Sequence, residues 1–347
     1  MRVRAVSGLT LLLLSPLLVA CSEDKDSTEP GDVIRAREDD QFKDGKEVTV
    51  VLPTGRLLIN SGAPVDSADS EETRAREDVD APSGAVLVPI TWQYDTWASD
   101  RLDGIFDTDV TPIVDLVSEG QDYRLPPPDT DAEAGESFYV VVDGDGEDRS
   151  LELDFEGVLQ TVDLKTGALD KGDAQGLYDI EDTRLKTTSC DEAGKWFEKD
   201  TVSAEFSCDV IGPVLTPYAD GKWAPAGDLY LVLTLSTELR VLTEIEDLTK
   251  AARYAATSVK VTTSIDGEKP TSSLPNEDGT NACPIPGAGV CGWSRHLIFA
   301  VPADDGEQGP LTAEVVYRLL LATSFGDWDP PTRQEVDAEE DIKLWDE

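Results

Sequence analysis

The chain has 347 residues, of which 71 are Asp or Glu and 29 are Lys or Arg, with one His and five Cys. Its formal net charge of -42 repels phosphate backbones, which excludes nucleic-acid binding through a basic face. A hydrophobic content of 39% is low for a globular protein but too high for a wholly disordered one. At about 150 residues per domain, the length predicts two domains with additional segments. A single histidine also excludes any site within one chain that needs two imidazoles.

Residues 1–20 have the features of an export signal. Two arginines form a basic start, and Leu9 to Val19 form an apolar stretch that is too short to span a bilayer comfortably. The end of this stretch, Leu18-Val19-Ala20-Cys21, resembles the lipobox of bacterial lipoproteins. The resemblance implies that the Cys21 thiol receives a lipid and that the signal is removed before it. An ordinary signal peptide with an incidental cysteine is the alternative.

The segment 21–46 is polar, with Pro30-Gly31 and the acidic run Glu38-Asp39-Asp40, and it is predicted to be a flexible acidic tether. At the other end, 325–347 carries nine acidic residues against two basic ones, which predicts a mostly disordered tail. Trp328 and Trp345 are unusual in such a tail. We expect them to dock on the folded body, with a short partner-binding segment as the alternative.

Between these ends, β-strand patterns dominate, and the sequence predicts an all-β fold. The apolar or alternating segments are bounded by Gly, Pro, Asp and Asn, and they begin at Glu47, Ala85, Ser137, Ser150, Asp228, Ser258, Arg295 and Leu311. One segment differs from this pattern. Residues Glu244 to Ala256 have apolar side chains near helical spacing, and Glu246 and Lys250 form an i,i+4 pair, which predicts a short helix.

An internal repeat relates the two halves of this region. Ala81-Pro82-Ser83-Gly84 and Ala224-Pro225-Ala226-Gly227 each precede an apolar strand. In the same order follow two further pairs of matching segments, 118–120 with 265–267 and 145–147 with 305–307. Because three matches occur in the same order, we predict tandem domains over 47–178 and 179–324.

Within each half, a strand led by Gly84 or Gly227 is followed by a long connection and then by a late apolar strand. This order resembles the telokin-like, immunoprotective-extracellular family of immunoglobulin-like domains in actinobacterial lipoproteins, across residues 47–324. The late strand ends in Val301-Pro302 in the second half, as in that family, but in Val142-Asp143 in the first. The resemblance implies two immunoglobulin-like β-sandwich domains of an exported protein.

Four cysteines remain after Cys21, namely Cys190, Cys208, Cys283 and Cys291. An even number in an exported protein indicates two disulfides, with three possible pairings. Nearest-neighbour pairing is favoured because each pair then closes a short loop. Zinc is the competing interpretation, but the chain has no CxxC pair and one histidine. We therefore predict no cofactor.

The acidic segment with Asp143, Asp145 and Glu147 is the candidate for a weak cation site. An EF-hand loop needs Gly at its sixth position, where this segment has Asp148, and a hairpin turn rich in Asp and Gly is the favoured interpretation. His296 lies in a strand-like segment, and the chain has no G-x-S-x-G motif, so we expect a structural histidine.

Trp92 and Tyr94 share one face of a strand by its period of two, and Trp97 follows them. An exposed pair of this kind stacks on a sugar or a partner protein, whereas a buried pair belongs to a sandwich core. The core interpretation is favoured.

These patterns predict a lipid-anchored protein on the extracellular face of the cell membrane. We expect no catalytic residues and a binding or scaffolding role at the bacterial envelope, with an envelope protein as the partner. A solute-binding lipoprotein of a transporter is the first alternative, although it requires βαβ alternation. An envelope hydrolase is the second alternative, and it requires a cleft with convergent polar groups.

Overall fold

The computed structural model describes residues 28–96, 105–106, 110–130, 134–180, 185–190, 196–197, 201–277, 279–283, 289–303 and 308–345. Their regular elements are almost all β-strands, with one turn of α-helix, α1 (Leu177–Ile180), and a 3₁₀ turn (Gly172–Ala174) among the described residues. The predicted all-β class is confirmed. The signal peptide, Cys21 and Trp97 lie outside the described residues.

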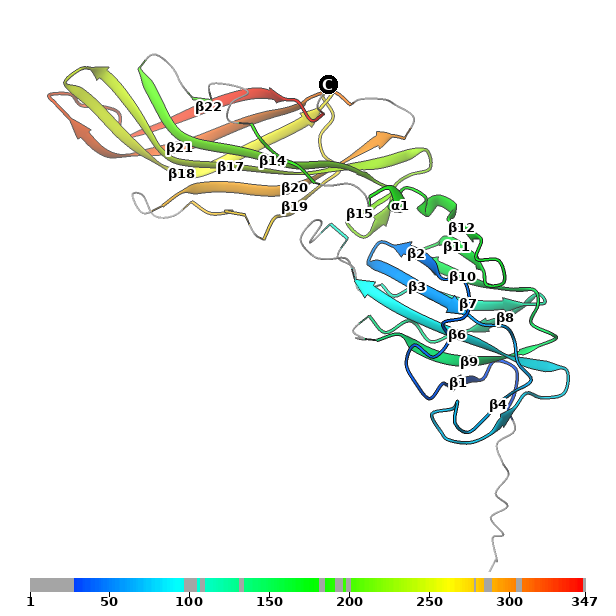
Figure 1. Cartoon of the computed structure of the whole chain (residues 1–347). Helices are drawn as coiled ribbons and strands as arrows, with labels where there is room; N and C mark the ends of the chain where they lie inside the picture. Colours follow the sequence, from blue (N-terminus) through cyan, green and yellow to red (C-terminus); the bar gives the residue numbers. More distant parts are fainter. Residues whose placement is uncertain are drawn as a thin grey trace, which may run out of the picture.

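The first unit contains two antiparallel five-stranded sheets (Figure 1). One has the order β1-β9-β6-β3-β2, formed by Val33–Arg35, Glu136–Asp143, Ala85–Thr96, Gly55–Ser61 and Val48–Leu52. The other has the order β12-β11-β10-β7-β8, formed by Leu169–Asp170, Val158–Asp163, Arg149–Phe155, Ile113–Ser118 and Gln121–Arg124. A short hairpin, β4 (Ser67–Ala68) with β5 (Val79–Asp80), lies beside them.

The core of the first unit lies between its two sheets. Alternate residues are buried in β3 and in β10, as expected for strands with one face on a core. Leu57 and Ile59 from one sheet and Leu151 and Leu153 from the other belong to one buried cluster. The two sheets therefore face each other across a shared apolar layer.

The second unit is built on one eight-stranded sheet. Its path is β13-β14-β17-β18-β21-β22, formed by Thr187–Ser189, Val202–Thr216, Asp228–Asp247, Lys250–Ile265, Leu311–Phe325 and Arg333–Ile342. Strand β20 (Cys291–Pro302) pairs with β17 and with β19 (Ser272–Pro275). Strand β20 pairs with the first part of β17, whereas β18 pairs with the last part of β17. The sheet therefore folds over a common core.

The predicted repeat has the same structural context in both units. Gly84 and Gly227 have φ of 85° and 88°, a conformation in which glycine avoids the strain of a side chain. Their carbonyls accept hydrogen bonds from the amides of Gly144 (2.8 Å) and Ala303 (2.9 Å), just beyond β9 and β20. In both units, the glycine-led strand is thus joined to the late strand at the same point.

The expected helix over Glu244 to Ala256 is wrong. This segment forms the end of β17, a two-residue turn and the start of β18. The buried residues Ala252 and Tyr254 face the core at strand spacing. Neighbouring strands β14 and β21 supply hydrogen-bonding partners here, so pairing within the sheet overrides the weak helical pattern.

The expected flexible tether is wrong from residue 28 onward. Strand β1 pairs with β9, and the Gly31 amide donates to the Val141 carbonyl at 2.8 Å. The ring of Phe42 packs edge-on against that of Tyr139, with centroids 4.8 Å apart. Thr28 donates from its hydroxyl to the Asp80 carbonyl at 2.9 Å, so the fold engages the chain from this residue.

The expected disordered tail is also wrong. Strand β22 pairs with β21 from Arg333 to Ile342, and its less exposed residues alternate with exposed ones that are mostly acidic. The acid content indicated disorder, but the period-two spacing of Val336, Ala338 and the other inner residues is that of a half-buried strand. Trp328 and Trp345 pack against the core of the second unit, which confirms the expectation that they dock on the folded body.

A small hairpin joins the two units. It consists of β15 (Tyr218–Ala219) and β16 (Lys222–Trp223), and it packs into the core cluster of the first unit. The Tyr218 hydroxyl donates to Glu156 Oε2 at 2.7 Å, and the Trp223 indole donates to the Phe155 carbonyl at 2.9 Å. With this contact, the molecule forms one elongated body (Figure 1).

Candidate functional site

The acidic turn after β9 uses its side chains to hold itself together. The Asp145 carboxylate accepts from the Glu147 amide at 2.9 Å, and Glu147 pairs with Lys165 at 2.6 Å. The buried guanidinium of Arg149 donates to the Gly146 carbonyl at 2.8 Å, and burial lowers the pKa of Arg149. Lys165 and Arg149 therefore already place positive charge at this turn.

The structure does not bring Asp143, Asp145 and Glu147 together as metal ligands. Across the described parts of the chain, no group of three or more His, Cys, Asp or Glu side chains is arranged to hold a metal ion. Instead, the Asp143 amide donates to the hydroxyl of Tyr123, on β8 of the other sheet, at 3.0 Å. The hairpin interpretation accounts for this segment, and the weak cation site has no support.

The aromatic pair is part of the core. Trp92 is 2% exposed and Tyr94 is 4% exposed, so neither ring offers a face for stacking on a ligand. The Trp92 ring packs edge-on against Phe138, with centroids 4.7 Å apart. The preferred core interpretation is confirmed for both residues.

His296 lies on β20 and is buried. Its Nδ1 lies 2.8 Å from the Thr234 hydroxyl on the neighbouring strand β17, directly across the pair. Such a cross-strand hydrogen bond satisfies a buried ring nitrogen and fixes its orientation. The structural role expected for this histidine agrees with its position.

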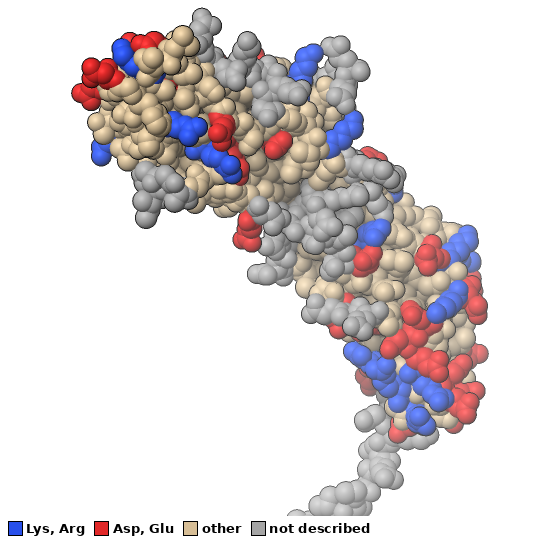
Figure 2. Space-filling model, turned by 60° about the vertical axis from the view of Figure 1, so that its left-hand side comes forward, with Lys and Arg blue, Asp and Glu red and all other residues tan. Residues whose placement is uncertain are grey.

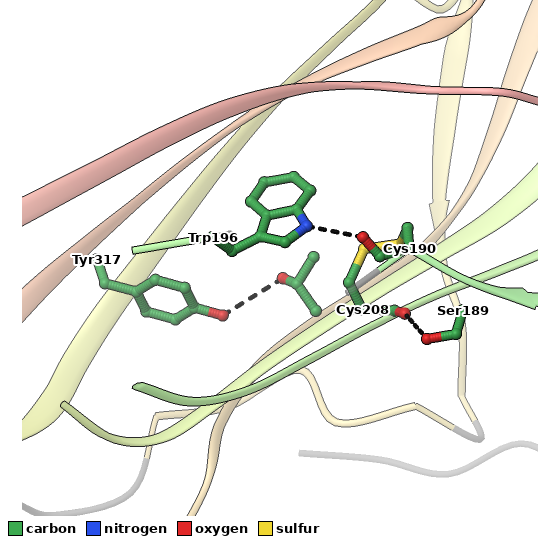
Figure 3. The surroundings of a disulfide bond; sticks show 6 residues. Ser189, Cys190, Trp196, Cys208 and Tyr317 are labelled. Atoms are coloured by element: carbon green, nitrogen blue, oxygen red, sulfur yellow. Dashed lines mark hydrogen bonds between the residues drawn. A yellow bond between two sulfur atoms is a disulfide. The ribbon is translucent and has the colours of Figure 1, made fainter. Parts of the chain in front are cut away.

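The four cysteines form the two favoured disulfides, Cys190–Cys208 and Cys283–Cys291. The first is buried against Trp196, whose indole donates to the Cys190 carbonyl at 2.8 Å (Figure 3). Nearby, the Tyr317 hydroxyl donates a hydrogen bond to the Thr237 hydroxyl at 3.4 Å within the same core. The first disulfide therefore fastens the start of the second unit to strand β14.

A small hollow opens at the edge of the first unit, between β1, β9 and the segment after β8. Its floor is apolar, because Val33 and Phe138 face inward from neighbouring strands. Four charged side chains at its rim come from three separate parts of the chain: Arg35 and Asp39, then Arg74, then Glu136. This hollow is a candidate for a small-molecule site.

Glu136 is the fixed centre of this hollow. Its Oε2 accepts from the Trp92 indole at 3.1 Å and from the Asp129 amide at 3.3 Å. Its Oε1 lies 3.8 Å from Arg35, whose side chain is 66% exposed. At that distance and exposure the ion pair is weak, so the Arg35 guanidinium keeps donors available at the rim.

The second guanidinium at the rim is that of Arg74, which pairs with Asp39 at 3.1 Å. The Arg74 amide donates to the Arg35 carbonyl at 3.0 Å, which holds the two arginines on adjacent backbone segments. Each guanidinium carries five N–H donors suited to an oxyanion. Two acids accompany the two arginines, so the rim has no net charge, and acidic and basic side chains are interspersed over the face of this unit in Figure 2.

Sequence reasoning missed this hollow, because its four polar residues are separated by up to about a hundred positions. Two of them, Arg35 and Asp39, lie in the segment 21–46 that was predicted to be a flexible tether. The pairing of β1 with β9 brings Arg35 beside Glu136. This pairing was not predicted, because the segment that contains β1 is rich in acidic residues.

No family model matches the chain, and neither the curated proteins nor the solved structures include a match to it. No helix in the described part of the chain is long and apolar enough to cross a membrane.

Proposed function

We propose that this chain is a lipid-anchored protein of the bacterial cell surface with a non-catalytic binding or scaffolding role. The observation that carries the proposal is the packed contact between the units, which joins them into one elongated body. A body of this kind keeps a distal surface at a set distance from its attachment point.

The position of Cys21 supports attachment at the near end. Six residues lie between Cys21 and Thr28, the first described residue, whose hydroxyl bonds to the Asp80 carbonyl. That length of chain reaches at most about 25 Å when fully extended. A lipid at Cys21 then holds the first unit close to the membrane, with the second unit beyond it. Two or more acyl chains give stable anchoring, whereas one is marginal.

We also propose a β-sandwich for each unit, supported by the shared core between the sheets of the first. The strand order is less favourable to the immunoglobulin-like version. In immunoglobulin domains the third strand lies with the sixth and seventh. Here β6, the third main strand of the first unit, lies beside β3, and β17 likewise lies beside β14. The resemblance to the immunoprotective-extracellular family therefore remains a proposal about sandwich architecture and export.

Solute binding is a second candidate function, and the hollow at Arg35 and Arg74 is the observation that favours it. The test uses acetate and inorganic phosphate as probes, with the fluorescence of the tryptophans, including Trp92, as the readout. Binding that is lost in Arg35→Ala and retained in Arg37→Ala supports a solute site. An envelope hydrolase has no comparable observation in its favour.

Incorporation of radiolabelled palmitate in intact cells tests the anchored function. The wild-type chain should carry the label and fractionate with membranes. The Cys21→Ala variant should carry no label and lose its membrane association. Equal labelling of the two chains, or no labelling of either, would contradict the proposal.

A further inference from the structure

The hairpin of β17 and β18 ends in an exposed apolar tip. Leu248 occupies the turn with its side chain fully exposed (105%), Phe325 is 58% exposed and Ile245 is 43% exposed. Ile245 pairs with Ala251, and Ala251 pairs with Phe325, so these three residues form a row across β17, β18 and β21. We call Ile245, Leu248, Ala251 and Phe325 the tip patch.

The turn and the end of β21 are held against each other. Gly326 lies so close to the carbonyl of Thr249 that a side chain at this position would collide with it. The turn is itself fixed, because the Asp247 carboxylate accepts from the Thr249 amide at 2.8 Å and pairs with Lys250 at 3.3 Å. The apolar side chains of the patch are therefore presented on an ordered support.

Folding gives no reason for an exposed leucine in this turn. Gly, Asn, Asp, Pro and Ser favour tight turns because of their backbone conformations or local hydrogen bonds, and Leu supplies neither. Three of the eight large apolar side chains that are exposed in the described structure gather at this tip. Single exposed apolar residues are ordinary, whereas a cluster on an ordered element indicates a contact surface.

The tip lies at the end of the molecule away from the first unit (Figure 1). Strand β17 has 20 residues and begins next to the junction hairpin, so its far end is roughly 60 Å away along the strand. If the chain is anchored at Cys21, the tip patch lies at the end of the molecule that is far from the membrane.

The charge around the tip patch indicates which kind of molecule can bind it. The segments 244–253 and 324–329 contain five acidic and two basic residues. Carboxylates at this density oppose burial in hydrocarbon, repel anionic lipid headgroups and repel the same tip of a second copy. A protein surface with an apolar pocket and a basic rim complements both the apolar row and its acidic surroundings.

We propose that the tip patch docks into an apolar, basic-rimmed pocket of another envelope protein, with Leu248 as the inserted side chain. This inference rests on the proposed binding role and names its surface. Leu248 is suited to the central position because it is the most exposed of the large apolar side chains in the described structure and stands on the two-residue turn of the hairpin.

Photo-crosslinking from position 248 of the full-length chain in intact cells of the host tests this proposal. A photoreactive side chain at position 159 is the matched control, because Leu159 is also an exposed leucine (44%) but lies on β11 of the first unit. We expect a single protein to be crosslinked from position 248 and not from position 159. That protein is then purified, and its affinity for the chain is measured.

Leu248→Ser should weaken this affinity by at least about tenfold, Leu159→Ser should leave it unchanged, and added salt should weaken it. Both variants should unfold at the wild-type temperature, because neither side chain is buried. Crosslinks to lipid or to a second copy, equal crosslinking from both positions, an affinity indifferent to Leu248→Ser, or no crosslink at all would each overturn the proposal. Palmitate labelling is independent of this experiment, so failure of the anchor and failure of the docking surface are distinguishable.

Discussion

Three tyrosine hydroxyls in the first unit are shielded from solvent by the fold. The Tyr178 hydroxyl donates to Gln160 Oε1 at 2.6 Å, and the Tyr94 hydroxyl is hydrogen-bonded to that of Thr54. The pKa values of Tyr94, Tyr139 and Tyr178 are each raised from 10.0 to about 12. Burial is the main cause in all three cases. Near Tyr139, the negative charge of Glu72 acts in the same direction.

These shifts predict a loss of stability in alkaline solution. Below pH 10 the phenols are neutral in both the folded and the unfolded chain, so they make no difference. As the pH rises from 10 to about 12, the unfolded chain releases these protons first, and the free energy of unfolding falls. Denaturant midpoints across this range, read with tyrosinate absorbance, check the prediction. Ionisation of all tyrosines near pH 10 with an unchanged midpoint would contradict it.

At the scale of one element, β22 explains part of the acidic charge. It is an edge strand of ten residues, and its exposed side chains include Glu335, Asp337, Glu339 and Asp341. Its free edge offers unpaired backbone groups to other chains, and charged side chains are a common protection against such pairing. Glu339 even lies directly opposite Glu314, an arrangement that costs stability within the sheet. The acids thus favour solubility over local stability.

Removing these charges should promote self-association. The combined change Glu335→Gln, Asp337→Asn, Glu339→Gln and Asp341→Asn leaves the strand pattern intact, and we expect concentration-dependent oligomers in light scattering after gel filtration. The control neutralises four exposed acids away from β22, Glu29, Asp44, Asp66 and Glu77, and it should stay at the mass of the wild type. Equal association in both variants would indicate that total charge, not the edge, is responsible.

The same elements mark the limit of prediction from sequence. The strands that begin near Ala85, Ser137 and Asp228 were predictable because their apolar runs exceed any competing signal. The strand content of 333–342 and of 244–256 was missed, because acid content and short helical spacing are local properties, whereas their strand form depends on β21 and β14 as neighbours. The hollow at Arg35 was missed for the same reason. The disulfide pairs were predictable because both loops are short.

At the scale of the whole molecule, the junction decides whether the chain acts as one body. Tyr218 is fully buried, and its ring packs edge-on against Phe155 and Trp223, with centroids 5.7 Å and 5.1 Å apart. Two hydrogen bonds to Phe155 and Glu156 fix the orientation of these rings. Aromatic packing combined with directional bonds resists both sliding and rotation between the units.

Trp223→Ala should therefore free the two units to move relative to each other. Spin labels on Ser83→Cys in the first unit and Ser324→Cys near the distal tip, both at exposed positions, report the distance between them by pulsed electron paramagnetic resonance. We expect a narrow distance distribution for the otherwise wild-type chain and a broad one for Trp223→Ala. The substitution removes a ring and an indole hydrogen bond, so it should also cost about 2 to 4 kcal/mol of stability.

Trp345→Ala is the matched control, because Trp345 is also a partly buried tryptophan but packs only on the core of the second unit. It should lower stability to a similar extent and leave the distance distribution narrow. Destabilisation alone thus cannot produce the expected difference, since both variants share it. An unchanged distribution in Trp223→Ala would mean that the units are held together without this contact. The body would then still be rigid, and the Tyr218–Trp223 hairpin would not be the contact that makes it so.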